Sequence, residues 1–298
     1  MENKIHDIQD ELLISILIPT YNRPEKTLRA VYSALQQNYS HIEVIVTDNS
    51  DNDQTKNLLE SIISDKRLRY YKNETNIGLL NNWKKALGLA KGAYIKILFS
   101  DDWMDSSFCK DAFFQFQVNP SVTAVFSNVL LRTYEKDIIL YSFNKTQTFA
   151  LEDYLENLIF KSNLSLSPGN FIFRSEAIQF KEFYYNDDLN MQVNNTGAGA
   201  DILLVLSSLI QKNSIAIGLP FFYSFFESKD DSVTLNKWPL VSAVYNKCLY
   251  EFVQESDISN KIALSKTLSE RVNGKQHWKN SASKFLKELN TKFNPFFK

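Results

Sequence analysis

Short apolar runs alternate with helical stretches along the first hundred residues of the chain. Four runs have the length and continuity of strands buried on both faces: Ile14–Ile18, Ile42–Thr47, Leu68–Tyr71 and Ala93–Phe99. Between the first two runs, Pro24 opens a stretch with helical spacing of apolar residues at Leu28, Val31, Tyr32 and Leu35. This alternation predicts an α/β fold with a mostly parallel sheet and helices on both of its faces.

The second half of the chain has a less regular pattern. It predicts strands at Val122–Leu131, Phe171–Phe173 and Phe221–Phe226, and helices at Leu151–Phe160 and Ala200–Gln211. From about residue 236 the pattern is mostly helical. Arg174, directly after a predicted strand, is expected to be solvated.

Polar clusters directly follow three of the predicted strands. The clusters are Pro19-Thr20-Tyr21-Asn22-Arg23, Asp48-Asn49-Ser50-Asp51 and Ser100-Asp101-Asp102. The carboxyl ends of parallel strands share one edge of the sheet, and ligands of open α/β sheets bind at that edge. The sequence therefore predicts a functional site where these clusters meet.

Asp101 and Asp102 follow an apolar strand, where two adjacent carboxylates repel each other and lose hydration. A hard divalent cation, held by one or two carboxylates and by substrate phosphates, would compensate for this. The alternative is an exposed turn that caps the next helix. The other two clusters at the same edge favour metal binding.

Three further positions have a plain structural interpretation. Asp48-Asn49-Ser50 has the composition of a simple turn, but its place after a buried strand favours recognition of a base or ribose. Asn76-Ile77-Gly78 resembles another turn, in which Gly78 tolerates a positive φ. Asp201 opens an apolar helix, where a carboxylate is favourable to the helix dipole without any catalytic role.

Composition and charge exclude several classes of protein. The 33 Lys and Arg residues balance 34 Asp and Glu residues, which argues against nucleic acid as a partner. No apolar run approaches the roughly 20 residues of a membrane-spanning helix. Residues 1–10 are polar and lack the pattern of a signal peptide, so a cytoplasmic location is expected, with the inner face of the cell membrane as a further option. The dinucleotide fingerprint, the phosphate loop and clustered histidines are all missing from the sequence.

Five stretches in order resemble the inverting family 2 glycosyltransferases of bacterial surface-polysaccharide synthesis, which have the GT-A fold. They are Ile16–Asn22, Glu43–Ser50, Asn76–Gly78, Ala90–Ile95 and Ser100–Asp102. The resemblance implies a Rossmann-like GT-A domain with a donor-binding half at 1–110, an acceptor-binding half at 111–235 and a helical extension at 236–298.

The resemblance also implies roles for individual residues. Pro19, Thr20, Tyr21, Asn22, Asp48, Asn49, Asn76, Gly78 and Asp101 would bind the nucleotide sugar, most simply a UDP sugar. Asp102, supported by Asp101, would hold Mn or Mg on the donor diphosphate. Asp201 would be the general base that removes a proton from a hydroxyl of a glycan or lipid-linked glycan acceptor.

This chain departs from the family pattern at three places. Asn49 stands where the family usually has a second Asp, and Phe99 stands where the metal motif often begins with another Asp. No histidine lies between His41 and His277, so the late histidine of many relatives is absent or is replaced from the segment 227–234. These departures keep open an alternative function, a non-catalytic nucleotide- or glycan-binding module.

The C-terminal residues 275–298 combine six lysines with a single acidic residue and several aromatic side chains. A basic amphipathic helix of this kind can lie on an anionic membrane surface. The alternative is a helix that packs on the domain or on a second copy of the chain. A peripheral membrane contact and a homo-oligomer are therefore both expectations for this tail.

Overall fold

The computed structural model describes residues 12–133, 136–161, 164–165, 167–178, 197–227 and 238–273. The amphipathic tail expected at 275–298 lies outside these residues, as does the segment 228–234.

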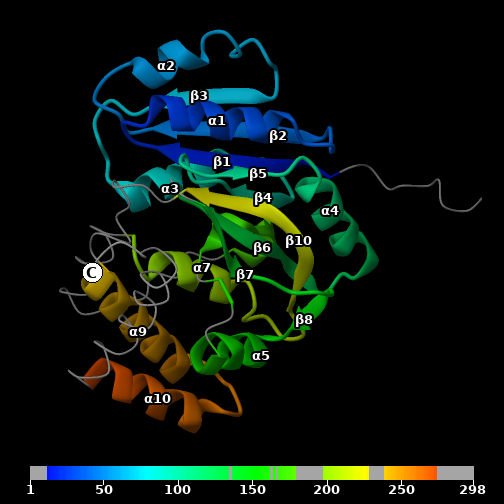
Figure 1. Cartoon of the computed structure of the whole chain (residues 1–298), viewed down its shortest axis with the longest axis vertical. Coiled ribbons are helices and arrows are strands. Elements are labelled where there is room, and N and C mark those ends of the chain that lie inside the picture. Colours follow the sequence, from blue (N-terminus) through cyan, green and yellow to red (C-terminus); the bar gives the residue numbers. More distant parts are fainter. Residues whose placement is uncertain are drawn as a thin grey trace, which may run out of the picture.

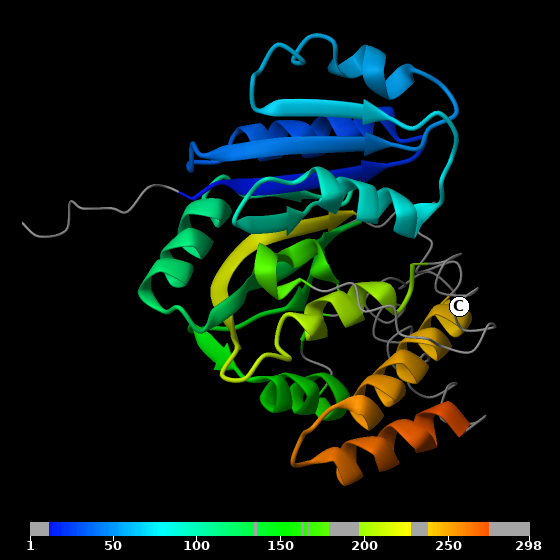
Figure 2. The ribbon, with the colours of Figure 1, turned by 180° about the vertical axis from the view of Figure 1, so that it is seen from behind.

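One mixed sheet runs through the described chain (Figures 1 and 2), with strand order β3-β2-β1-β4-β9-β6-β10-β5; in addition, β7 pairs with β6 and β8 with β10. The strands are β1 (Ile14–Thr20), β2 (Ile42–Asp48), β3 (Leu68–Lys72), β4 (Tyr94–Ile97), β5 (Trp103–Met104), β6 (Val122–Arg132), β7 (Asp137–Tyr141), β8 (Gln147–Phe149), β9 (Phe171–Arg174) and β10 (Ile215–Glu227). The helices are α1 (Pro24–Leu35), α2 (Gln54–Leu59), α3 (Leu79–Leu89), α4 (Phe108–Val118), α5 (Leu151–Glu156), α7 (Ala200–Ser207), α9 (Trp238–Glu255) and α10 (Lys261–Asn273).

The first four strands are parallel to one another, as the strand–helix alternation predicts. β1 pairs with β2 and β4, and β2 pairs with β3, all in parallel register. β9 then enters antiparallel between β4 and β6. The carboxyl ends of β1, β2 and β4 consequently lie at the same edge of the sheet, with the start of β9 beside them.

Two hydrophobic cores cover the two faces of the sheet. On one face, the side chains of α1 and α4 pack on Ile14, Ile16 and Ile18 of β1. On the other face, Leu17 of β1 belongs to a core to which α3, α5, α7, α9 and α10 contribute. Every residue of β1 and β2 is buried, so both strands are mostly apolar on both faces, and their polar side chains find partners, as Ser15 does in Glu43.

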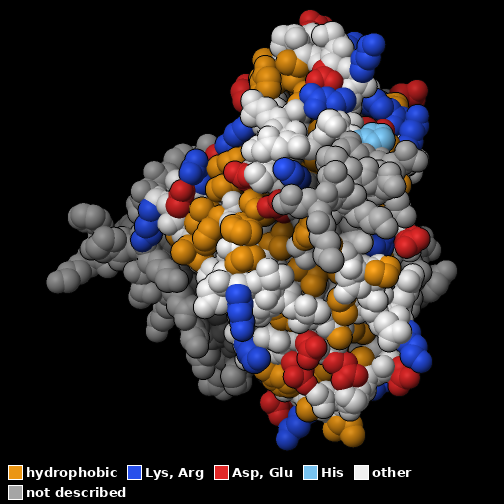
Figure 3. Space-filling model, turned by 90° about the vertical axis from the view of Figure 1, so that its right-hand side faces the viewer, with side chains coloured by type: hydrophobic (Ala, Val, Ile, Leu, Met, Phe, Trp, Pro, Cys, Tyr) orange, Lys and Arg blue, Asp and Glu red, His pale blue; other side chains and the backbone are white. Residues whose placement is uncertain are grey.

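The surface that faces right in Figure 1 carries α4. Figure 3 shows hydrophobic side chains gathered on this face, and the exposed apolar residues of α4 are Phe114 and Val118. Among the described residues, no helix has both the length and the apolar character that crossing a membrane requires.

The structure corrects three local predictions. Arg174 is only partly exposed: its guanidinium donates to the carbonyls of Val122 and Phe116, and its carbon lies 5.6 Å from the centre of the Tyr94 ring. The helix predicted to reach residue 211 ends at Ser207. The aromatic strand predicted from residue 221 begins six residues earlier, at Ile215 in β10.

Candidate functional site

The loops after β1 and β2 are bonded to each other at the carboxyl edge of the sheet. The Asn22 backbone N–H donates to Ser50 Oγ at 2.8 Å, and the Tyr21 hydroxyl donates to Asp51 Oδ2 at 3.1 Å. Asn22 holds a positive φ of 51°, which turns the chain toward α1. Tyr21 is 46% exposed, so its ring is accessible to a ligand. Pro19 and Thr20, by contrast, are buried at the end of β1.

Asp48 and Asn49 form the buried floor of this edge. The Asp48 carboxylate accepts hydrogen bonds from the Tyr70 hydroxyl and from the Ser50 backbone N–H. Burial, followed by the bond to Asp48, raises the pKa of the Tyr70 hydroxyl above its usual range.

The Asn49 amide explains one departure from the family pattern. Its Nδ2 donates to the Gly78 carbonyl at 3.1 Å, while its Oδ1 accepts from Asn73 Nδ2 at 2.6 Å. An aspartate could accept the second bond, but it has no N–H to donate to Gly78. Asn49 therefore fixes the loop that contains Asn76 and Gly78. That loop is closed by a bond from the Gly78 N–H to Asn76 Oδ1, and Gly78 has φ +82°.

Asp101 and Asp102 differ sharply in their surroundings. Asp101 is partly exposed, and its Oδ2 lies 2.5 Å from Arg23 Nη1, so an ion pair joins this motif to the loop after β1. Asp102 is buried, and its Oδ1 accepts from the Glu227 backbone N–H at 3.2 Å. Burial, followed by the like charge of Asp101, raises the pKa of Asp102 well above its usual value.

A buried lysine lies beneath the same motif. Lys96 in β4 is inaccessible to solvent, and its ammonium donates to the Gly169 carbonyl. Burial lowers the pKa of Lys96 to about 7, while the negative charge of Asp102 acts in the opposite direction.

The acidic pair fits a divalent cation of the kind that also binds phosphate. Within the described part of the chain, no three His, Cys, Asp or Glu side chains converge into a protein-only metal cage. Asp102 directs a buried carboxylate to this edge, and its Oδ2 accepts no hydrogen bond from the described residues. One carboxylate with open positions for water and substrate phosphates is a typical Mg²⁺ arrangement.

The segment 227–234 was expected to replace the missing histidine, and Glu227 is the one residue of it that the structure describes. Its carboxylate is largely buried and is paired with Arg29 at 3.1 Å and with Lys26 at 3.6 Å, both from α1. Because those cations engage its side chain, Glu227 supports the Asp102 loop through its backbone N–H.

Asp201, in the first turn of α7, lies in a different environment. Its Oδ1 accepts backbone N–H bonds from Gly199 at 3.0 Å and from Ile202 at 2.9 Å, and its Oδ2 accepts a bond from the Tyr245 hydroxyl of α9. Burial raises the pKa of Asp201 to about 7, although these three hydrogen bonds act in the opposite direction. A carboxylate with this pKa can accept a proton near neutral pH.

Two glycines place the Asp201 turn. Gly197 has φ +70° and lies so close to Leu79, the first residue of α3, that an added Cβ would stand 2.8 Å from the Leu79 side chain. Since Leu79 directly follows Gly78, the Asp201 turn borders the edge formed by the first four strands. Gly199, with φ +89°, packs still more closely on Cys248 of α9, where an added Cβ would stand 2.4 Å from the sulfur.

The structure thus brings together the predicted residues of the loops after β1, β2 and β4 and of the 76–78 turn, with the Asp201 turn beside them. Sequence reasoning missed Lys96, Arg29 and Tyr245. A lysine within an apolar strand was a visible signal for the first. No pattern in the sequence marks Tyr245, because its partner lies 44 residues earlier in the chain.

Comparison with known proteins matches this architecture to one family. The sequence profile described as glycosyl transferase family 2 matches residues 15–180. An uncharacterized glycosyltransferase of Methanocaldococcus jannaschii is 30% identical over 183 residues, which cover 60% of this chain and 61% of that protein.

A second relative has a described reaction. It is the Escherichia coli UDP-Glc:alpha-D-GlcNAc-diphosphoundecaprenol beta-1,3-glucosyltransferase WfaP, 34% identical over 129 residues, or 43% of this chain and 49% of that protein. The chain thus spans about half to three fifths of the length of these two curated relatives.

Among solved structures, residues 1–349 of S. aureus TarS in complex with UDP-GlcNAc superpose with a TM-score of 0.66 at 17% identity. The match covers 95% of this chain and 77% of that one. At this identity the likeness concerns the fold, and it confirms the expected GT-A type of α/β sheet.

Proposed function

Because the chain belongs to glycosyl transferase family 2, we propose that it transfers a sugar from a nucleoside diphosphate donor to a hydroxyl of a glycan or lipid-linked glycan acceptor. The observation that carries this proposal is the meeting of four polar loops at one sheet edge, beside a carboxylate whose pKa is about 7. UDP is the proposed nucleotide. This choice is supported by WfaP, which is named for a UDP sugar and a lipid-linked acceptor, and by the structure of TarS residues 1–349, which was solved in complex with UDP-GlcNAc.

The donor is proposed to lie across the carboxyl ends of β1, β2 and β4, within residues 1–110. The exposed Tyr21 ring and the loop of Asn76 and Gly78 would border the base, and Asp48 and Asn49 would form the floor beneath it. The Asp101–Arg23 pair would face the ribose and diphosphate.

Asp102 is the proposed ligand of Mn or Mg, with Asp101 in support. A divalent cation bound there would act as a Lewis acid on the departing diphosphate. The chain contributes the orientation of that carboxylate, which the Glu227 N–H fixes from one side while Arg29 and Lys26 hold Glu227.

Asp201 is the proposed base, within an acceptor half at 111–235. Its carboxylate would take the proton of the acceptor hydroxyl while that oxygen forms a bond to the anomeric carbon. The bond between the anomeric carbon and the diphosphate oxygen breaks in the same displacement, so the anomeric configuration inverts. The base needs direct contact with the hydroxyl, and partial protonation near pH 7 suits proton transfer in both directions.

The first test is nucleotide binding followed by thermal unfolding. The chain is melted with UDP, GDP, CDP or dTDP, each with Mn²⁺, with Mg²⁺ or with a chelator. Because a ligand that binds only the native state raises its stability, UDP with metal should raise the melting temperature by a few degrees.

Asp102→Ala should abolish the metal-dependent part of that shift, with Asp65→Ala as a surface control, since Asp65 is paired with Arg67 outside the proposed site. Metal-independent binding by the wild type would contradict the proposed role of Asp102. Failure of all four nucleotides would instead favour the alternative function, a binding module that lacks turnover.

Two further proposals concern a peripheral membrane contact of the C-terminal residues and the formation of a homo-oligomer. Membrane contact through 275–298 would show as co-sedimentation with anionic liposomes that is lost on truncation at residue 274. Light scattering during size exclusion would test for a homo-oligomer.

A further inference from the structure

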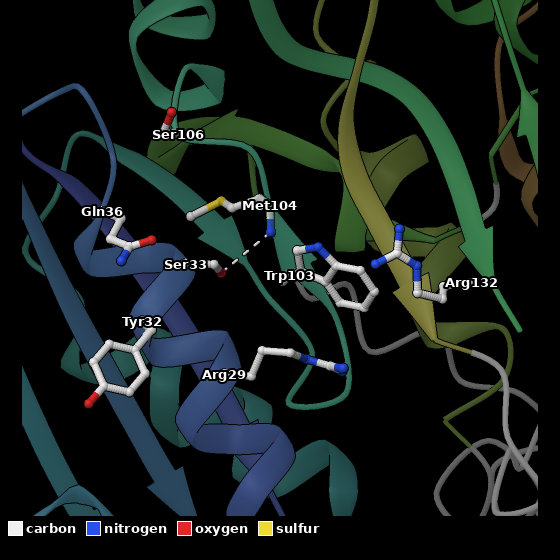
Figure 4. Close-up of a pocket in the computed structure, with 8 residues that line it drawn as sticks. All are labelled: Arg29, Tyr32, Ser33, Gln36, Trp103, Met104, Ser106 and Arg132. Atoms are coloured by element: carbon white, nitrogen blue, oxygen red, sulfur yellow. Dashed lines mark hydrogen bonds between the residues drawn. The ribbon is translucent and has the colours of Figure 1, made fainter. Parts of the chain in front are cut away.

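A pocket adjoins the proposed metal site but contains none of the residues proposed to bind the donor. It has a volume of about 370 Å³, and Figure 4 shows its lining from α1, from β5 and the residues after it, and from the end of β6. The lining residues are Arg29, Tyr32, Ser33, Gln36, Trp103, Met104, Ser106 and Arg132. β5 begins directly after Asp102, so the pocket starts one residue from the metal motif.

Arg29 connects the pocket to that motif. One of its terminal nitrogens donates to the Asp101 carbonyl at 2.5 Å, and its guanidinium carbon lies 4.3 Å from the centre of the Trp103 ring. A ligand in this pocket would therefore lie beside the donor diphosphate, separated from it by the Arg29 side chain.

The indole of Trp103 is held as a rigid platform. It stacks on Phe225 of β10 with ring centres 5.5 Å apart and planes 4° from parallel, and the two residues are partners in the β5–β10 ladder. Arg29 and Arg132 extend toward the same indole in Figure 4, and the guanidinium carbon of Arg132 lies 5.2 Å from the ring centre. Such stacked arginines are positioned before a ligand arrives.

The lining combines two cations with no carboxylate. The acidic partners of these arginines, Glu227 and Asp137, lie outside the lining. The Arg132–Asp137 pair is largely exposed, with side chains 51% and 39% accessible. An exposed pair of this kind contributes little to stability, so Arg132 can exchange its carboxylate for an anion of a ligand at small cost.

Arg29 adds a buried donor without an acceptor. Its Nε is inaccessible to solvent and makes no hydrogen bond to the described residues. Buried donors are normally satisfied, and leaving one unpaired is unfavourable. Because solvent does not reach this nitrogen, a ligand oxygen would bond to it only after a shift of the Arg29 side chain, and Arg29 contributes to the pocket through its charge.

We propose that this pocket binds a sugar residue that carries a carboxylate or a phosphate, as part of the acceptor glycan. The exposed ring of Tyr32 and the amide group of Gln36 suit a sugar, while Arg29 and Arg132 suit its anionic group. The assignment to the acceptor rests on the proposed function. The chemistry of the pocket is independent of it.

Calorimetric titration of the full chain tests the proposal with four probes. They are a hyaluronan tetrasaccharide (sugar carboxylates), glucose 6-phosphate (a sugar phosphate), the neutral chitotetraose, and inorganic phosphate. At least one anionic sugar should bind ten times more tightly than both chitotetraose and inorganic phosphate. Arg132→Gln should weaken that binding at least tenfold. The matched control Arg67→Gln, which breaks a pair formed with Asp65 elsewhere, should change it less than twofold.

Four results would overturn the proposal. They are no binding of either anionic sugar, equal binding of chitotetraose, equal binding of inorganic phosphate alone, and equal weakening by the two arginine variants. UDP binding is measured on the same samples and should be unchanged in Arg132→Gln. If UDP fails to bind the wild type while an anionic sugar binds through Arg132, the donor function fails and the pocket stands.

Discussion

Tyr245 should set the pH at which the proposed base becomes active. Its hydroxyl donates to Asp201 Oδ2, and this bond is the largest of the effects that lower the Asp201 pKa against the rise caused by burial. Tyr245→Phe removes the donor while it preserves the ring that packs on the core. Because the bond stabilises the ionised carboxylate, its loss raises the pKa.

The size of the effect follows from the strength of such a bond. A hydrogen bond to a charged group contributes about 1.5–3 kcal/mol, and about 1.36 kcal/mol corresponds to one pKa unit. If water replaces part of the bond, the shift is about one unit, from about 7 to about 8. The ionised fraction of Asp201 at pH 7 then falls from about one half to about one tenth.

The assay is the pH profile of kcat/KM for sugar transfer, together with the Asp201 carboxyl signal in ¹³C NMR, which needs no substrate. The acidic limb should move up by about one pH unit. Activity should fall about fivefold at pH 7 and recover by pH 9. Tyr250→Phe, which removes a hydroxyl from the same helix, is the matched control and should leave the limb in place. An unmoved limb in Tyr245→Phe, or an equal loss at every pH, would refute the reasoning.

Two other predictions concern the same turn. The pKa of Asp201 is about 7 in the native chain against a usual 3.8, so the native state binds more protons between these values and loses stability as the pH rises through them. Asp201→Asn removes this titrating group, so the melting temperature of the variant relative to wild type should increase by a few degrees between pH 5 and pH 8. A difference that does not change with pH would contradict the burial of this charge. The same variant should abolish transfer, because the proposed base is lost, and should leave UDP affinity unchanged. Gly199→Ala and Gly78→Ala both place a side chain at positive φ, in sparsely populated backbone regions that cost about 1–3 kcal/mol each. Only the first also brings a Cβ within 2.4 Å of Cys248 Sγ, so urea unfolding should show a further loss of about 1–3 kcal/mol for Gly199→Ala, and equal losses would mean that α9 does not pack there.

The helix α1 shows how far hydrophobic spacing carries a prediction. The period of Leu28, Val31, Tyr32 and Leu35 predicts a helix over the correct segment. The residues that the structure buries are Thr27, Ala30, Val31 and Ala34, while Tyr32 is 42% exposed. Small side chains lie against the sheet because the helix packs close to it, and the large ones flank that contact. The hydrophobic pattern predicts the element, but the size of the side chains determines which face is buried.

The donor edge could be predicted from the order of strands along the chain, whereas the surroundings of the proposed base could not. The three polar clusters lie at or shortly after the carboxyl ends of β1, β2 and β4, so the chain order of these strands is enough to predict that the clusters meet. The base depends on contacts between remote segments: the Asp201 turn abuts Leu79 of α3, and α9 supplies Tyr245 and Cys248. No local pattern encodes these contacts, so the sequence predicted Asp201 only through a family resemblance and did not predict Tyr245. It follows that Tyr245→Phe, which keeps the packing of α9, should change the pKa of Asp201 and leave UDP affinity at the donor edge unchanged.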